Sequence, residues 1–204
     1  TKPWGQIFTT AELKDAIAKN SPKVVGIVMA ETSTGASQPI SEIADVAHDA
    51  GALLIVDAVT SLGGMNVDAD QWGIDAIYSG TQKCLSCPPG LAPISFSPTA
   101  VAKVEQRRTK VASWYLDISM IANYWGKNRA YHHTAPINMT YALHEALRLL
   151  HKEGLEASFA RHALNHQALK IGLETLGFTY AADPDHQLPM LNAVNLPDGV
   201  DDAQ

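Results

Sequence analysis

Two short apolar runs on either side of an amphipathic helix constrain the fold of this chain more than any other feature. The run 24–30 is continuous and apolar, which is typical of a short strand covered on both faces. A helix is predicted to begin at Ser41 and to stop at Gly51, and the second apolar run, 52–56, follows at once. Strand, helix and strand with short connections predict a βαβ unit with parallel pairing and a right-handed crossover. We therefore expect an α/β fold, in which Thr10 caps a first short helix.

Polar residues suited to catalysis follow the strands of this predicted sheet. Asp57 closes the second apolar run, and a further short run, 74–78, leads to Lys83. Because ligands bind at the carboxyl edge of open α/β sheets, we expect Asp57 and Lys83 to face one site. Such a pair suits pyridoxal phosphate, since a lysine can form the Schiff base while an acid pairs with the pyridine nitrogen. The alternative is that Asp57 caps a turn and Lys83 is a solvated loop lysine.

The composition is that of an ordinary globular protein. The 204 residues are 46% hydrophobic and 18% charged, enough for one sizeable core or for one domain and part of another. The net charge of −6 gives no general attraction to nucleic acid or to anionic membranes, and no apolar run approaches the roughly 20 residues that span a bilayer. The presence of only two cysteines indicates a reducing compartment, with the cytoplasm as the default expectation.

The later part of the chain has a helical pattern. Asn138 is predicted to cap a helix that ends at Gly154 and carries an apolar stripe packed in the core. A second amphipathic helix is predicted from about Leu155 to Leu176. Because the chain lacks an initiator Met and stops directly after a strand-like segment, 191–196, we expect it to be an internal piece of a longer protein.

A block rich in hydroxyl groups, from Glu31 to Gly35, follows the first predicted strand. We expect it to lie beside Asp57, because the two strands are neighbours in a βαβ unit. Its hydroxyls are then placed to hydrogen-bond either a cofactor or the Asp57 carboxylate. The alternative is a plain turn, which Ser and Thr favour in any protein.

Four blocks of the sequence form an ordered set of motifs. They are Glu31-Thr32-Ser33-Thr34-Gly35; Val56-Asp57-Ala58-Val59-Thr60-Ser61-Leu62-Gly63-Gly64; Tyr78-Ser79-Gly80-Thr81-Gln82-Lys83 with Pro88-Pro89-Gly90; and Tyr131-His132-His133-Thr134. This set resembles the class V aminotransferases, specifically the alanine–glyoxylate, serine–glyoxylate and serine–pyruvate aminotransferase group. The resemblance covers essentially the whole chain, at roughly half the usual length of such an enzyme. One departure is that Met29-Ala30 stand where the family often has His-Gly.

The resemblance implies the fold of the fold-type I enzymes that depend on pyridoxal phosphate. Residues 1–153 would form most of a three-layer α/β/α large domain with a mostly parallel sheet, its N-terminal part missing. Residues 154–204 would begin a smaller, truncated α+β C-terminal domain. The glycine-rich phosphate loop and the arginine that binds the substrate carboxylate are expected outside this chain. The chain alone is therefore expected to bind cofactor weakly and to transaminate poorly.

The resemblance also implies roles at the pyridine end of the cofactor. Lys83 would hold pyridoxal phosphate as a Schiff base and act as the catalytic acid–base. Asp57 would pair with the pyridine nitrogen, and Thr32 would contact the cofactor on the Asp57 side. No metal is implied.

At the phosphate end, the resemblance implies contacts from two subunits. Gln82 would lie beside the phosphate of its own subunit's cofactor. Tyr131 and Thr134 would reach the phosphate of the neighbouring subunit's cofactor, so the enzyme would be a homodimer with shared sites.

The implied reaction is transamination between a small amino acid, alanine or serine, and a 2-oxo acid, glyoxylate or pyruvate. One alternative is a cysteine desulfurase or another lyase of the same superfamily, although such enzymes usually have His directly before the lysine and Gln82 stands here. A second alternative is an inactive scaffold that keeps the fold. A redox pair of Cys84 and Cys87 is a weaker hypothesis, because the two cysteines lie inside the loop after Lys83.

Overall fold

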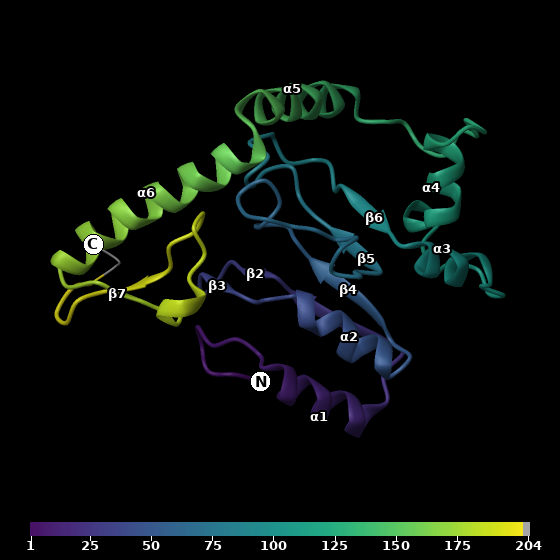
Figure 1. Cartoon of the computed structure of the whole chain (residues 1–204). Coiled ribbons are helices and arrows are strands. Elements are labelled where there is room, and N and C mark those ends of the chain that lie inside the picture. The colour runs from purple at the N-terminus through teal and green to yellow at the C-terminus, as the bar shows by residue number, and fades with distance from the viewer. Residues whose placement is uncertain (202–204) are drawn as a thin grey trace.

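The computed structural model describes residues 1–201 and contains a central four-stranded sheet (Figure 1). Its strands, in spatial order, are β1 (Val24–Val28), β4 (Leu53–Asp57), β5 (Ala76–Tyr78) and β6 (Ile94–Phe96). The pairs β1–β4 and β4–β5 are parallel, while β6 is antiparallel to β5. The predicted α/β class with a mostly parallel sheet is confirmed.

Helices and short hairpins surround this sheet. The helices are α1 (Thr10–Asn20), α2 (Ser41–Asp49), α3 (Pro98–Glu105), α4 (Ile118–Trp125), α5 (Ile137–Glu153) and α6 (Leu155–Thr175), with short 3-10 helices at Trp114–Leu116 and Pro184–His186. Two further two-stranded sheets pair β2 (Ala30–Glu31) with β3 (Ala36–Ser37) and β7 (Thr179–Tyr180) with β8 (Val194–Asn195). Within residues 1–201, no helix combines the length and apolar character needed to cross a membrane.

The predicted βαβ unit is present as β1, α2 and β4. In the parallel register Val28 lies opposite Asp57, and α2 begins at Ser41 as predicted. Gly51 has a φ of +70°, a left-handed conformation that favours glycine and lets the chain leave α2 and enter β4. The unit therefore ends with the Asp57 side chain at the carboxyl edge of the sheet.

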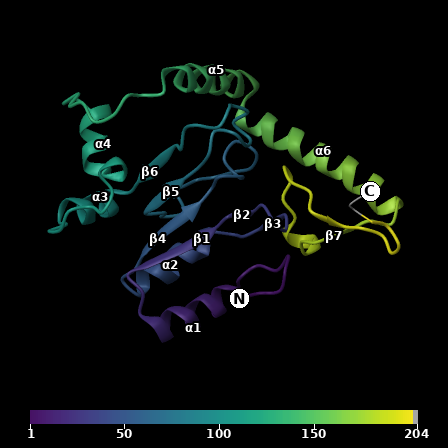
Figure 2. The ribbon, with the colours of Figure 1, turned by 180° about the vertical axis from the view of Figure 1, so that it is seen from behind.

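The hydrophobic core lies between α2 and one face of the sheet. Leu54 and Val56 are fully buried on this face, because alternate residues of a strand point to the same side. Ile43 of α2 belongs to the same buried cluster, and α1 lies beside α2 (Figure 2). Ile55 and Asp57 point to the opposite face and are only half-buried. Packing on one face thus fixes which side of the sheet receives the Asp57 carboxylate.

A buried carboxylate, Asp75, joins three elements of the fold through hydrogen bonds. Its oxygens accept hydrogen bonds from Leu54 N (2.9 Å), His48 Nε2 (2.8 Å) and Ser97 Oγ (2.9 Å). Burial opposes the charge of Asp75, but these three donors outweigh it and hold the pKa of the carboxyl below its usual value. Asp75 therefore ties α2 and β4 to Ser97, the N-cap residue of α3.

Replacing Asp75 by alanine is expected to lower the unfolding free energy of the complete protein by about 3 kcal/mol, because three donors lose their acceptor. A carboxyl whose pKa is lowered in the folded state stabilises the fold above its unfolded pKa and loses this effect in acid. The difference from the wild type should therefore be full at pH 7 and smaller at pH 3, as measured by urea unfolding. The exposed Asp15 of α1 provides the control, since Asp15→Ala should change stability by at most about 0.5 kcal/mol. An equal loss at both pH values would contradict the role of the Asp75 charge.

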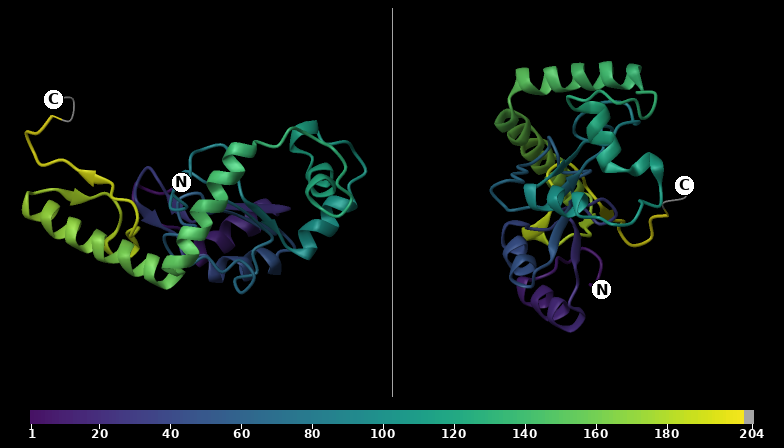
Figure 3. Two further views of the ribbon diagram at one scale, coloured as in Figure 1. Left: turned by 90° about the horizontal axis from the view of Figure 1, so that it is seen from above. Right: turned by 90° about the vertical axis from the view of Figure 1, so that its right-hand side faces the viewer.

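Helix α5 differs from the sequence prediction in two respects, whereas α6 has the predicted bounds to within one residue. Helix α5 begins at Ile137 after Pro136, so Asn138 is not its cap. The prediction that its apolar stripe packs in the core is wrong, because α5 has no buried residue in the described structure and Tyr141 is 74% exposed. Figure 3 shows α5 running along the outside of the molecule, where its main packing partner is α6.

The segment after Gly154 contacts the loops at the carboxyl edge of the sheet. The hydroxyl of Ser158, which is buried, donates to the Gly63 carbonyl at 2.9 Å. Leu188 N donates to the Gly35 carbonyl at 2.9 Å. The segment therefore braces the two loops that follow β1 and β4. The last residues of the predicted second domain, 202–204, lie outside the described residues.

Candidate active site

The carboxyl ends of the parallel strands bring the predicted site residues to one edge of the sheet. Backbone hydrogen bonds continue past the strand ends, from Met29 N to Asp57 O (3.0 Å) and from Ala58 N to Tyr78 O (2.9 Å). The hydroxyl block, Asp57 and the segment leading to Lys83 therefore leave three neighbouring strands side by side. This is the common edge that the sequence predicted.

The Asp57 carboxylate is held by two donors. Its Oδ1 accepts from Val59 N at 2.9 Å, and its Oδ2 accepts from the hydroxyl of Tyr78 at 2.7 Å. This contact raises the pKa of the Tyr78 phenol, so Tyr78 remains a donor at neutral pH. Tyr78 was not predicted to be a site residue. Asp57 and Tyr78 both close predicted neighbouring strands, however, and this position indicates that they can lie side by side.

The hydroxyl block does not reach the Asp57 carboxylate. The Thr32 hydroxyl pairs with the Thr60 hydroxyl at 2.9 Å, and the Glu31 carboxylate accepts from both the backbone and the hydroxyl of Ser33. The suggestion that these hydroxyls hydrogen-bond Asp57 is therefore wrong for residues 31–35. Thr32 is exposed and remains available to a ligand at the edge.

A cavity of about 490 Å³ opens on the sheet face next to Asp57. Its floor includes Gly26 and Ile55 from the sheet, and its rim includes Asp57 and Tyr78. Lys83 is not among the residues that line this cavity. The space above Gly26 is open, since nothing lies within 4 Å of the position that a Cβ would take.

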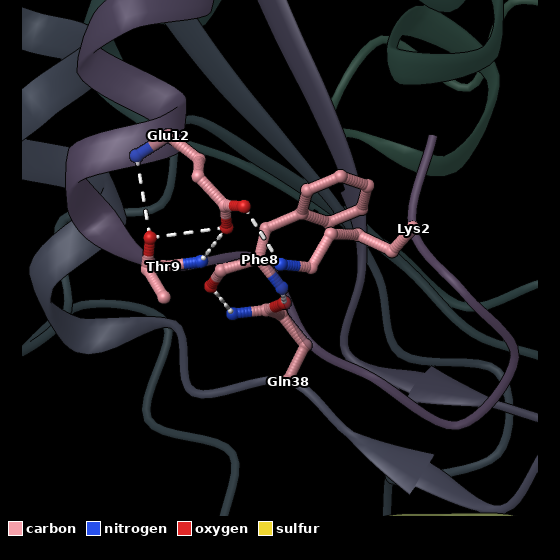
Figure 4. Close-up of polar contacts among 5 residues, drawn as sticks. All are labelled: Lys2, Phe8, Thr9, Glu12 and Gln38. Atoms are coloured by element: carbon pink, nitrogen blue, oxygen red, sulfur yellow. Dashed lines mark hydrogen bonds and ion pairs between the residues drawn. The ribbon is translucent and has the colours of Figure 1, made fainter.

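The far wall of this cavity is the N-terminal segment, which is pinned by its own polar contacts (Figure 4). The side-chain amide of Gln38 accepts from Phe8 N (2.8 Å) and donates to Phe8 O (3.1 Å), so it pairs with the Phe8 backbone as a neighbouring strand would. Thr9 and Glu12 form a reciprocal capping box, so Thr9 rather than the predicted Thr10 caps α1. The hydrogen bond from Lys2 and the capping contacts lower the pKa of Glu12 to about 2.

The loop that carries Lys83 is anchored at its base. Ser79 N donates to Pro93 O at 2.9 Å, and the buried Thr81 hydroxyl donates to Pro88 O at 2.8 Å. Cys87 N closes the loop by donating to Thr81 O at 3.0 Å. Lys83 itself is exposed, so a fixed backbone presents its side chain at the edge of the sheet.

Close packing surrounds this loop on both sides. Gly80 is buried beneath the side chain of Gln82, whose Oε1 would lie 2.8 Å from a Cβ at that position. Gly64 leaves room for the Cys84 thiol, which donates to Thr60 O at 3.3 Å. Burial raises the pKa of Cys84, which makes this thiol less reactive and favours a packing role over redox chemistry.

Tyr131 and Thr134 form an exposed hydroxyl pair on the connection between α4 and α5. Their oxygens lie 3.1 Å apart, and Tyr131 is 74% exposed. Between them, His132 is buried, and its Nε2 lies 3.0 Å from the Trp114 carbonyl, which can only accept a hydrogen bond. Among residues 1–201, no hydrogen bond joins this pair to Asp57 or Lys83, so the two predicted halves of the site remain separate in this single chain.

The family model of the class V aminotransferases matches residues 4–203 of the sequence. The chain belongs to this family. It is 38% identical to the (S)-ureidoglycine–glyoxylate transaminase of Bacillus subtilis, over 97% of the chain and 52% of the relative. It is 41% identical to the alanine–glyoxylate aminotransferase of Oryctolagus cuniculus, over 95% of the chain and 50% of the relative.

The fold agrees with that of solved class V structures. The alanine–glyoxylate aminotransferase of Nostoc sp. superposes with a TM-score of 0.96 at 48% identity, over 98% of this chain and 53% of that one. The fold is therefore that of the fold-type I enzymes, as the family resemblance implied. The chain spans about half the length of the relatives that it matches.

The residues at the edge fit pyridoxal phosphate, on which this family depends. The Asp57 carboxylate accepts two hydrogen bonds and keeps lone pairs for a third donor, as pairing with a pyridine N–H requires. The exposed Lys83 offers a primary amine at the same edge. The chain therefore contains the acid and the amine that the cofactor needs.

Proposed function

We propose that the protein transfers an amino group between a small amino acid, alanine or serine, and a 2-oxo acid, glyoxylate or pyruvate. The observation that carries this proposal is the delivery of Asp57 and the Lys83 loop to one sheet edge by the adjacent strands β4 and β5. Family membership supports the reaction class. The names of both relatives above include glyoxylate, which favours glyoxylate as the acceptor here.

In this proposal the chain's own residues divide the work at the pyridine end. The Lys83 amine would hold the cofactor covalently and, when free, would act as the acid–base that takes up the proton of the substrate Cα. The cofactor, when bound, accepts the electron pair of the broken Cα–H bond. Asp57 keeps the pyridine nitrogen protonated because its negative charge favours the positive form. Thr32 contacts the cofactor on the Asp57 side.

At the phosphate end, we propose that the site is shared by two copies of the chain. Gln82 lies beside the phosphate of its own subunit's cofactor. The hydroxyls of Tyr131 and Thr134 are exposed, and a neighbouring copy would bring a phosphate to them. Neutral hydroxyl donors suit a dianion that backbone amides also bind. This arrangement makes the active protein a homodimer.

The proposed organisation of the chain follows the same family pattern. Residues 1–153 belong to the large cofactor-binding domain, and residues from 154 onward begin a smaller domain. Gly154, with a φ of +91°, separates α5 from α6 at this boundary and supports the division. The cytoplasm stays the expected compartment, on the basis of the cysteine content alone.

Borohydride reduction of the complete protein with pyridoxal phosphate is expected to attach a pyridoxyl group to Lys83, because reduction fixes a lysine–aldehyde bond. Peptide mass spectrometry would locate the adduct. Lys103, an amine on α3 distant from the sheet edge, serves as the internal control and should remain unmodified. A folded protein without an adduct on Lys83 would reject the proposal in favour of an inactive scaffold.

A further inference from the structure

We propose that Tyr78 is a positioning residue whose hydroxyl holds the Asp57 carboxylate in the orientation that meets the pyridine nitrogen of the cofactor. This inference rests on the proposed function, because it assumes that Asp57 faces the pyridine nitrogen. It adds a residue that contacts the acid and not the cofactor itself.

The strand register builds the contact between Tyr78 and Asp57. The two residues are paired across the parallel β4–β5 ladder and each closes its strand, so their side chains leave the same face of the sheet. The oxygen–oxygen distance of 2.7 Å is typical of a hydroxyl that donates to a carboxylate. The carboxylate in turn raises the pKa of the phenol, so Tyr78 keeps its proton and acts as a donor throughout the neutral range.

The two donors on Asp57 leave a defined direction for a third. Val59 N occupies one lone pair of Oδ1, and the Tyr78 hydroxyl occupies one lone pair of Oδ2. A carboxylate has about four such positions, so a pyridine N–H can still be accepted. Because both existing donors are attached to the sheet edge, rotation of the carboxylate is restricted before the cofactor arrives. Restricting a binding group in its productive orientation lowers the entropy lost on binding.

Asp75 is a carboxylate with a structural role, and its donors and exposure can be compared with those of Asp57. Its three donors come from β4, α2 and the start of α3, and it is 3% exposed. Asp57 instead has two donors, is half-buried, and borders a cavity on the face of the sheet. The Tyr78 hydroxyl therefore serves a carboxylate that is arranged to accept one more partner.

The test is Tyr78→Phe in the complete protein, which removes the hydroxyl and keeps the ring. The dissociation constant of pyridoxal phosphate, measured by fluorescence quenching, is expected to rise about 10-fold, as for the loss of a hydrogen bond to a charged group. Tyr180→Phe is the matched control, because the Tyr180 hydroxyl in β7 donates to Asn192 Oδ1 at 2.9 Å and not to Asp57. Its dissociation constant should stay within twofold of the wild type.

A double-mutant cycle separates positioning from a general structural effect. If Tyr78 acts through Asp57, the effect of Tyr78→Phe should fall below about threefold in an Asp57→Asn background. An undiminished effect in that background, or a wild-type dissociation constant for Tyr78→Phe, would overturn the inference. Borohydride labelling of Lys83 in the wild type is measured alongside. If that labelling fails, the proposed function fails; if it succeeds while the cycle shows no coupling, only the role of Tyr78 fails.

A measurement on the cofactor-free protein covers the case in which Tyr78→Phe does not fold. Ultraviolet titration of the tyrosines is expected to show one phenol that ionises at lower pH in Asp57→Asn than in the wild type, because the carboxylate that raises the pKa of Tyr78 is gone. Identical titration curves would show that the hydroxyl does not donate to Asp57 and would overturn the inference.

Discussion

Replacing Lys83 by arginine in the complete protein is expected to lower the transamination rate by roughly 10²–10⁴-fold, the range that a positioned acid–base contributes. Arginine keeps the positive charge but stays protonated, so it supplies no neutral amine for covalent attachment or for proton transfer. The fold should tolerate the change, because the side chain of Lys83 is exposed and its loop is anchored by Ser79 and Thr81. The rate would be measured with alanine and glyoxylate.

The control for this substitution is Lys103→Arg, which makes the same chemical change on α3. It should leave the rate unchanged, and its circular dichroism should match that of Lys83→Arg. If Lys83→Arg retained wild-type turnover, the assignment of Lys83 and the proposed transamination chemistry would both be lost.

Replacing Asp57 by asparagine is expected to lower the same rate by about 10–1,000-fold. Asparagine has nearly the same shape and can still accept from Val59 N, but it lacks the charge that keeps a pyridine nitrogen protonated. An opposite charge at hydrogen-bond distance shifts a pKa by about 1–3 units, which sets this range. Steady-state kinetics with alanine and glyoxylate would measure the loss.

Asp68 provides the matched control, since its carboxylate also accepts a backbone N–H, from Gln71 at 3.2 Å, but in a turn away from the sheet edge. Asp68→Asn should leave the rate unchanged. Equal rates for Asp57→Asn and the wild type would place the pyridine nitrogen elsewhere, even if Lys83 were labelled.

The sequence predicted the βαβ unit correctly because its signals are local. The apolar run before Asp57 and the turn at Gly51 each depend on a few neighbouring residues, and the parallel register of β1 with β4 follows from them. The common edge of Asp57 and Lys83 then follows from parallel pairing alone. The start of α1 was misplaced by one residue, because both Thr9 and Thr10 are suitable caps and only the capping box with Glu12 distinguishes them.

Contacts between distant segments were not predictable in the same way. The Tyr78 hydroxyl meets Asp57 only because β5 pairs with β4 in one particular register, and a one-residue shift would have turned it to the other face. The stripe on α5 was predicted to be buried from its periodicity, yet periodicity does not say which surface covers a helix. The hydroxyls of Tyr131 and Thr134 lie 3.1 Å apart, but their role at the phosphate of a second copy's cofactor stays a prediction.

The loop between β5 and β6 is anchored, and this anchoring reduces the conformational entropy that the protein loses when it binds its cofactor. Backbone hydrogen bonds at Ser79 and Cys87 fix the path of the chain on both sides of Lys83. Ordering a flexible loop on binding would cost about 1–2 kcal/mol of conformational entropy for each residue. Here that freedom is already lost during folding, so in the proposed site mainly the side-chain rotamers of Lys83, worth about 2 kcal/mol, remain to be restricted. Substitutions of Thr81 that remove its hydrogen bond to Pro88 O should therefore weaken cofactor binding without changing any group that contacts the cofactor.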